Sequence, residues 1–199
     1  MGEKINAINI EKYPAIKKHL QCFEPKLSNR GDKGITQYNL RNCAYMDDFE
    51  KEKIVWASVG ESHYTYVEKG QLLLDTNYFA VFRENEINRY VLGLLNSKLI
   101  IRWINEIDTP VGTVAYRHYK YNFEQIPIPK ISGALQQPFV KIVNDILEGK
   151  KSGQSTSTLE KEIDLMVYKL YDLTYDEVLV VEPGFNLSNV EYENYSINL

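Results

Sequence analysis

Apolar side chains recur every three or four residues between Glu86 and Leu99. They are Ile87, Tyr90, Val91, Leu94, Leu95 and Leu99. This spacing places them on one stripe of an α-helix, so the segment predicts the central core helix of the fold. Asn85 precedes the stripe and is predicted to cap the helix. Gly93 costs about 1 kcal/mol relative to alanine inside a helix, which predicts that a neighbouring backbone approaches closely there.

A second amphipathic pattern predicts an N-terminal helix. Its apolar positions are Tyr13, Ile16, Leu20, Phe23 and Leu27. Pro14 suits the first turn of a helix, and Pro25 predicts a kink or an end near Glu24. The following residues, 28–34, are rich in turn formers and predict a loop. That loop is either a solvated connection or a place where Arg30 and Lys33 meet phosphate.

Runs of β-branched and aromatic residues predict strands between these helices. Residues 53–59 predict a buried strand, residues 64–67 and 72–74 flank a polar turn as a hairpin would, and residues 77–82 predict a further strand. Residues 126–129 read Ile-Pro-Ile-Pro and predict an edge strand or an extended connector, because each proline removes a ladder donor. The fold class predicted is α+β, with a mixed or antiparallel curved sheet.

The C-terminal part predicts a pair of helices. One begins at Pro138 and ends at Gly149, and the other carries Leu159, Ile163, Val167 and Leu170 on one face. Ser157 is the preferred cap of the second helix, because Glu160 then completes a capping box. The small polar residues 152–158 between them predict a flexible linker. We therefore expect two parts, residues 1–131 and a C-terminal helical subdomain at 132–199.

Composition restricts the class of protein. The chain has 199 residues, of which 25% are charged and 44% apolar, typical of a globular domain. No apolar run has membrane-spanning length and the N-terminus lacks the apolar core of a signal peptide, so we expect a cytoplasmic protein with no membrane partner. Cys22 and Cys43 lack metal-ligand spacing and predict free thiols, without a zinc site.

Charge is unevenly distributed along the chain. The formal net charge is −4, yet residues 159–199 hold two basic and nine acidic residues, which leaves 21 basic and 18 acidic residues in 1–158. The larger part is mildly basic, so the net charge does not exclude a nucleic-acid partner. The 15 tyrosines suit half-hydrated surfaces, because the ring is apolar and the hydroxyl is polar.

Enzyme chemistry finds little support in the residues. His63 has no serine, cysteine or carboxylate at a spacing that would make it a catalytic base. Glu148-Gly149-Lys150 has the letters of a magnesium-binding nuclease motif but falls at a predicted helix end, where Gly149 is expected as a C-cap.

An ordered set of short segments runs through nearly the whole chain. The segments are Tyr13-Pro14, 27–30, 32–34, 53–56, Asn77-Tyr78, 92–99, 126–129, Ile163-Asp164 and 168–174. In this order they resemble the TaqI-like C-terminal specificity domain and, more loosely, the target recognition domains of type I specificity subunits. The resemblance implies a domain that selects the target sequence for an adenine-specific DNA methyltransferase or a fused type II restriction-modification enzyme.

The resemblance also implies what lies elsewhere. An adenine methyltransferase needs an Asn-Pro-Pro-Tyr-type motif and a glycine-bearing turn for S-adenosylmethionine, and neither is present in this sequence. We therefore expect a noncatalytic domain that uses no cofactor, partnered with double-stranded DNA and with a methyltransferase or nuclease module in the full-length protein or another chain. S-adenosylmethionine, and Mg²⁺ for a nuclease, would belong to that module. The alternative is a protein-interaction module in a restriction-modification or phage-defence assembly.

The expected DNA-binding residues come from the segment before the Pro-Ile-Pro element, where aromatic and basic residues alternate, and from basic positions nearer the N-terminus. They are Thr113, Tyr116, Arg117, Tyr119 and Lys120, together with Arg30, Lys33 and Arg41. Cations beside aromatic rings offer phosphate contacts and apolar faces together. The competing interpretation is an exposed strand with ordinary tyrosines.

Overall fold

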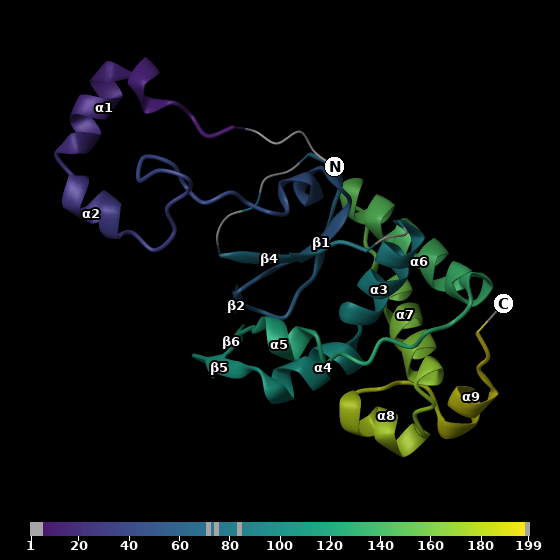
Figure 1. Cartoon of the computed structure of the whole chain (residues 1–199). Coiled ribbons are helices and arrows are strands. Elements are labelled where there is room, and N and C mark those ends of the chain that lie inside the picture. The colour runs from purple at the N-terminus through teal and green to yellow at the C-terminus, as the bar shows by residue number, and fades with distance from the viewer. Residues whose placement is uncertain (1–5, 71–72, 74–75, 83–84, 198–199) are drawn as a thin grey trace. The chain divides into compact units, whose positions relative to one another are not determined.

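The computed structural model describes residues 6–70, 73, 76–82 and 85–197, and for 85–87 the backbone alone. The chain divides into two compact units, residues 1–48 and 49–199. Figure 1 shows the helices and strands of both. The fold is α+β, as the sequence predicts. The predicted division of the chain at residue 131 stays a prediction.

The first unit consists of short helices and a folded loop. Its elements are the 3-10 helix η1 (Ile10–Lys12) and the helices α1 (Pro14–Gln21) and α2 (Glu24–Asn29), and a second 3-10 helix, η2 (Met46–Glu50), spans the boundary with the second unit. The predicted break near Glu24 is confirmed, and Pro25 occupies the first turn of α2. None of the described residues 6–48 is buried.

Two small antiparallel sheets form the β part of the second unit. One sheet has the order β3-β1-β4 and the other β2-β6-β5. The strands are β1 (Lys53–Ala57), β2 (Val59–Gly60), β3 (Thr65–Val67), β4 (Asn77–Ala80), β5 (Thr109–Val111) and β6 (Ala115–Arg117). The strand predicted at 53–59 is divided at Ser58 between the two sheets. Of the segment 72–74 that is predicted to complete a hairpin, residues 72 and 74 lie outside the described residues.

Helices are the main regular elements of the second unit. They are α3 (Asn85–Leu95), α4 (Lys98–Ile107), α5 (Lys120–Phe123), α6 (Gly133–Lys151), α7 (Ser157–Leu170), α8 (Tyr175–Val181) and α9 (Asn189–Asn194). Figure 1 shows α3, α6 and α7 side by side, and contacts between α3 and α6 and between α6 and α7 confirm that they pack together. Residues 126–129 form no strand, consistent with the expected connector.

The predicted central helix is confirmed as the core. Tyr90, Val91, Leu94 and Leu95 are each at most 2% exposed and join one apolar cluster with residues of β1, α4, α6 and α7. The prediction of one uninterrupted helix is wrong, because the chain breaks at Asn96 and Ser97. The Asn96 amide bonds the backbone N–H and carbonyl of Tyr64, and Ser97 caps α4. The expected cap at Asn85 concerns a side chain outside the described residues.

The C-terminal helix pair is confirmed, but its boundaries differ from the prediction. Helix α6 begins five residues earlier than expected, capped by Ser132, and accommodates Pro138 within its first two turns. It also continues past Gly149, so Gly149 is not a C-cap. The N-cap position of α7 is Thr156 rather than Ser157, and the Thr156 side chain makes no capping hydrogen bond to the helix backbone. Proline near a helix start loses one hydrogen bond, which the surrounding packing offsets.

The segment at 152–156 is a tight turn rather than a flexible linker. Ser152 Oγ donates to the carbonyl of Glu148, and the Gln154 N–H donates to the carbonyl of Gly149 at 2.9 Å. Thr156 is buried, and a Cβ on Gly149 would lie 2.7 Å from its methyl group. Small polar residues therefore allow close packing of α6 and α7 here.

A polar cluster attaches the last helices to α4. The Asp164 carboxylate accepts the backbone N–H of Lys98 at 2.8 Å, and the Lys98 ammonium contacts both Asp164 and Glu182. Tyr168 donates its hydroxyl hydrogen to Glu182. Desolvation by burial raises the pKa of Asp164, and the Lys98 groups oppose that shift. A second apolar cluster of Leu165, Tyr168, Val178 and Tyr192 lies beneath α8 and α9.

Gly93 permits the close packing of α3 on α6. A Cβ at this position would lie 2.9 Å from Cγ2 of Val143, which is 3% exposed. The neighbour that approaches is thus a side chain rather than the expected backbone. Because valine is stiff at χ1, it cannot easily give way.

Gly93→Ala is expected to lower the free energy of unfolding by about 1–2 kcal/mol, since the added methyl overpacks this contact. In a Val143→Ala background the same change is expected to be neutral or stabilising by up to about 1 kcal/mol, because the space is then open and alanine favours the helix. Urea unfolding of the wild type, the two single variants and the double variant measures both effects. Gly133→Ala, where a Cβ meets open space, is the control. Equal effects of Gly93→Ala in both backgrounds would contradict the assignment of Val143 as the side chain that the added methyl group overpacks.

Candidate nucleic-acid interface

The β5–β6 hairpin carries most of the residues that the sequence singles out. Its strands pair from Thr109 opposite Arg117 to Val111 opposite Ala115, and β2 pairs with the other edge of β6. Gly112 in the turn has a φ of +71°, a left-handed conformation that favours glycine. All three residues of β5 are exposed. The hairpin is visible at one end of the second unit in Figure 1.

A buried polar cluster holds the base of this hairpin. Asp108 precedes β5 and His118 follows β6, and Nδ1 of His118 lies 2.7 Å from Oδ2 of Asp108. Asn122 Nδ2 donates to Oδ1 of Asp108 at 2.7 Å and to the carbonyl of Ile107 at 3.0 Å. All three side chains are at least 95% buried, so these bonds are shielded from water. The cluster thus fixes both ends of the hairpin to each other and to α5.

Aromatic stacking connects α5 to the core. Phe123 stacks on Trp56 of β1, with ring centroids 4.1 Å apart and an interplanar angle of 19°. Tyr64 contacts both rings, and its burial, with a further contribution from the charge of Asp108, raises the pKa of its phenol. The backbone N–H of His118 donates to the backbone carbonyl of Ser58, which lies between β1 and β2. The hairpin therefore stands on a rigid base.

The predicted residues of this segment lie on the hairpin and on the start of α5. Thr113 is exposed in the turn, Tyr116 is half-buried, and Arg117 is exposed. Tyr119 stacks on Tyr121 with ring centroids 5.0 Å apart. Lys120 is exposed and forms an ion pair with Glu124 at 2.9 Å. These five residues lie within one short segment, residues 113–120, and residues 109–123 contain no acidic side chain.

The three predicted cations of the first unit surround its folded loop. Arg30 donates to the carbonyls of Gln37 and Asn39, and the ammonium of Lys33 donates to the carbonyl of Ser28 at 2.8 Å. The backbone N–H of Arg41 donates to Asp32, and its side chain is exposed. Arg30 and Lys33 thus stabilise the loop, which the sequence pattern did not indicate.

His118 and Asp108 are the important residues that sequence reasoning missed. His118 stands between two predicted contact residues, Arg117 and Tyr119, but its side chain points inward. Alternation along a strand was the available signal, because an exposed Arg117 implies that His118 faces the other side. The partner Asp108, ten positions earlier, is not indicated by any local pattern.

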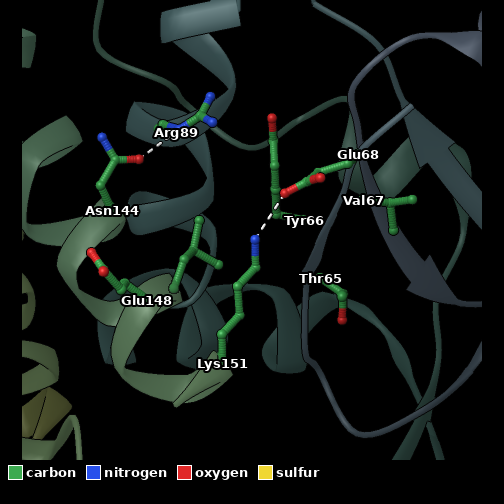
Figure 2. Close-up of a pocket in the computed structure, with 9 residues that line it drawn as sticks. Thr65, Tyr66, Val67, Glu68, Arg89, Asn144, Glu148 and Lys151 are labelled. Carbon is green, nitrogen blue, oxygen red and sulfur yellow. Dashed lines mark hydrogen bonds and ion pairs between the residues drawn. The ribbon is translucent and has the colours of Figure 1, made fainter.

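A cleft on another part of the second unit differs from the hairpin in its charged side chains. It has a volume of about 670 Å³ and lies between β3, α3 and α6. Figure 2 shows Arg89 bonded to Asn144 and Lys151 bonded to Glu68 across it. The ion pair with Lys151 lowers the pKa of Glu68, and burial raises the pKa of Tyr66 to about 12. The cleft is lined by the acidic side chains Glu68 and Glu148 as well as by Arg89 and Lys151, whereas residues 109–123 of the hairpin segment contain no acidic side chain.

Two further properties of the described residues concern metal ions and membranes. Within this part of the protein, His, Cys, Asp and Glu side chains form no group of three or more that could hold a metal ion. Among the helices of the same residues, none has the length and hydrophobicity needed to cross a membrane.

Comparison with known proteins identifies the class. The family model of the TaqI-like C-terminal specificity domain matches residues 3–128, more than half of the chain. The chain therefore belongs to this family of specificity domains, which confirms the resemblance found in the sequence. The match includes the β5–β6 hairpin and its buried polar cluster.

One curated relative of this chain is a type II methyltransferase. The type II methyltransferase M.MjaIV of Methanocaldococcus jannaschii is 25% identical over 166 residues, which cover 78% of this chain and 55% of that protein. The chain thus spans little more than half the length of this relative.

Asn122→Ala is expected to lower the free energy of unfolding by about 1–3 kcal/mol, because it leaves a buried carboxylate oxygen and a backbone carbonyl without their donor. Urea unfolding followed by circular dichroism measures the change. Asn194→Ala, at an exposed position of α9, is the matched control and is expected to change stability by less than about 0.5 kcal/mol. Equal stability of the two variants would refute a supporting role for the polar cluster.

Proposed function

We propose that this chain is a noncatalytic DNA-recognition domain that positions duplex DNA for a separate catalytic module. Membership of the specificity-domain family carries the proposal. The exposed, acid-free hairpin on its buried polar base supports it, because such a surface can approach phosphates without repulsion. The hairpin and the start of α5 provide the proposed contacts, Thr113, Tyr116, Arg117, Tyr119 and Lys120.

Arg117 and Lys120 are the proposed phosphate contacts of this surface. Among the described residues, no ion pair or hydrogen bond engages the Arg117 guanidinium. Lys120 pairs with Glu124, but both side chains are more than half exposed. An exposed pair of this kind contributes about 0–1 kcal/mol, so Lys120 can exchange it for a phosphate at little cost. Arg41, with an exposed side chain, is a further proposed contact, and Arg30 and Lys33 combine that role with stabilising their loop.

The catalytic module is proposed to lie in the full-length protein or in another chain. One relative that matches the chain is a type II methyltransferase nearly twice as long as the matching region. S-adenosylmethionine, and Mg²⁺ where the module cleaves DNA, are assigned to that module. Methylation of a base requires that the base be flipped out of the duplex, so a recognition domain that holds the DNA aids the reaction.

The division of labour within the chain and its location complete the proposal. We assign target recognition to residues 1–131 and a supporting role to the helices in 132–199. We expect the protein to act in the cytoplasm. A protein-interaction module in a restriction-modification or phage-defence assembly is the alternative, and membership of a specificity-domain family favours DNA recognition over it.

Arg117→Ala and Lys120→Ala are each expected to weaken binding to duplex DNA. Each is also expected to reduce the slope of log affinity against log salt by about 0.9, as expected for one lost phosphate contact. Fluorescence anisotropy of the 199-residue chain between about 50 and 200 mM salt measures both quantities. Lys161→Ala, which removes an exposed lysine on α7, is the matched control and is expected to change neither.

A double Arg117→Ala, Lys120→Ala variant that keeps the fold, the affinity and the salt slope would remove this segment from the interface. Weak binding of the unaltered chain that does not depend on salt would instead favour the protein-interaction alternative.

A further inference from the structure

The tip of the β5–β6 hairpin is apolar and uncharged, unlike its base. Val111 is 37% exposed and Val114 is 65% exposed, with Gly112 and Thr113 between them. The first charged side chain after Asp108 is Arg117, at the base. Exposed valines at a turn carry an unfavourable hydration cost, which a partner surface would relieve.

The dimensions of the tip restrict which partner surface can take it. Strand β2 pairs only with Tyr116 and Arg117, so the hairpin beyond Tyr116 is a ribbon of two strands. From Arg117 to Val114 the chain extends about 10 Å, at about 3.3 Å per residue. The major groove of B-DNA is about 12 Å wide and 8.5 Å deep and admits a two-stranded ribbon, whereas the minor groove is about 6 Å wide.

The distribution of charge along the hairpin agrees with its insertion into the major groove. Phosphates line the rim of the groove and base edges form its floor. With the tip at the floor, Arg117 lies near the rim, where a cation is stabilised, and the uncharged tip meets bases. A Cβ on Gly112 would meet no atom within 4 Å, so the outer side of the turn is open to a ligand.

We propose that the hairpin tip, residues 111–114, enters the DNA major groove and that Val111 and Val114 read thymine methyl groups there. This inference rests on the proposed function and identifies the residues that determine its specificity. The Thr113 hydroxyl is placed to hydrogen-bond a base edge beside these contacts. The chemistry selects thymine at the contacted positions, because its methyl group is the apolar feature of the major-groove floor.

The buried polar cluster makes such reading selective. Asp108 and His118 bond to each other at the two ends of the hairpin, so the strands cannot splay apart without breaking a buried contact. A reader that is rigid before binding loses little conformational entropy on binding. A wrong base pair is therefore not easily accommodated by movement of the tip.

Selection from a library of random-sequence duplexes tests the inference. The 199-residue chain is expected to select a preferred sequence that contains thymine. Replacing each contacted thymine with deoxyuridine, which lacks only the methyl group, is expected to weaken binding about 3–5-fold per methyl. The Val111→Ala, Val114→Ala double variant is expected to bind with wild-type salt dependence but to lose this sensitivity to deoxyuridine.

Val180→Ala, Val190→Ala is the matched control, since these valines of α8 and α9 are 62% and 70% exposed. It should retain the preferred sequence and the deoxyuridine sensitivity. A tip variant that also retains both, or a wild-type chain that binds DNA without any thymine preference, overturns the inference and leaves the proposed function intact. Absence of salt-dependent binding by the wild-type chain overturns both.

Discussion

The packing of α3 against α6 and α7 is the constraint on which the second unit depends. Tyr90, Leu94 and Leu95 remove a continuous apolar stripe from water, and Gly93 allows Val143 to approach closely. Burial of large apolar side chains contributes about 1.5–3 kcal/mol each, and no other helix of the unit contributes a longer buried stripe in the main cluster. The break that follows at Asn96 and Ser97 turns the chain into α4, and α4 leads directly to Asp108 and the hairpin. The core thus determines where the candidate interface stands.

Buried polar contacts extend this order beyond the apolar core. Asn96 bonds the backbone of Tyr64, and Asp164 bonds the first N–H of α4. Asn96 and Asp164 belong to two of the short segments by which the sequence resembles the family, 92–99 and Ile163-Asp164, so these two segments contain joints between elements of the fold. Asp108, His118 and Asn122 form a comparable joint under the hairpin. Substitutions at exposed positions of the hairpin can therefore leave this buried polar cluster, and the base of the hairpin that it holds, unchanged.

The sequence predicted the parts of the fold that repeat with a regular period. The stripe from Tyr90 to Leu95 and the amphipathic helices follow from spacing, and the strands at β1 and β4 follow from runs of β-branched and aromatic residues. Boundaries set by single contacts were not predictable in this way. Leu99 continues the stripe across the break at Ser97, and Pro138 resembles a helix start although Ser132 provides the cap. The turn at 152–156 has a linker composition, yet Thr156 packs against Gly149. For the candidate site, the aromatic and basic residues Tyr116, Arg117 and Tyr119 could be proposed as contacts from the sequence, whereas the pairing of His118 with Asp108 depends on a tertiary contact that no local pattern indicates.

Recognition of duplex DNA through the β5–β6 hairpin is the central claim, and photo-crosslinking tests it most directly. In a duplex of the selected sequence, 5-iododeoxyuridine replaces thymine and places a photoreactive atom at the position of the methyl group in the major groove. After irradiation with the 199-residue chain, mass spectrometry identifies the attached peptide. The account predicts attachment within residues 109–121, where Tyr116, Tyr119 and Tyr121 provide reactive rings. Attachment confined to α8 and α9 would contradict it.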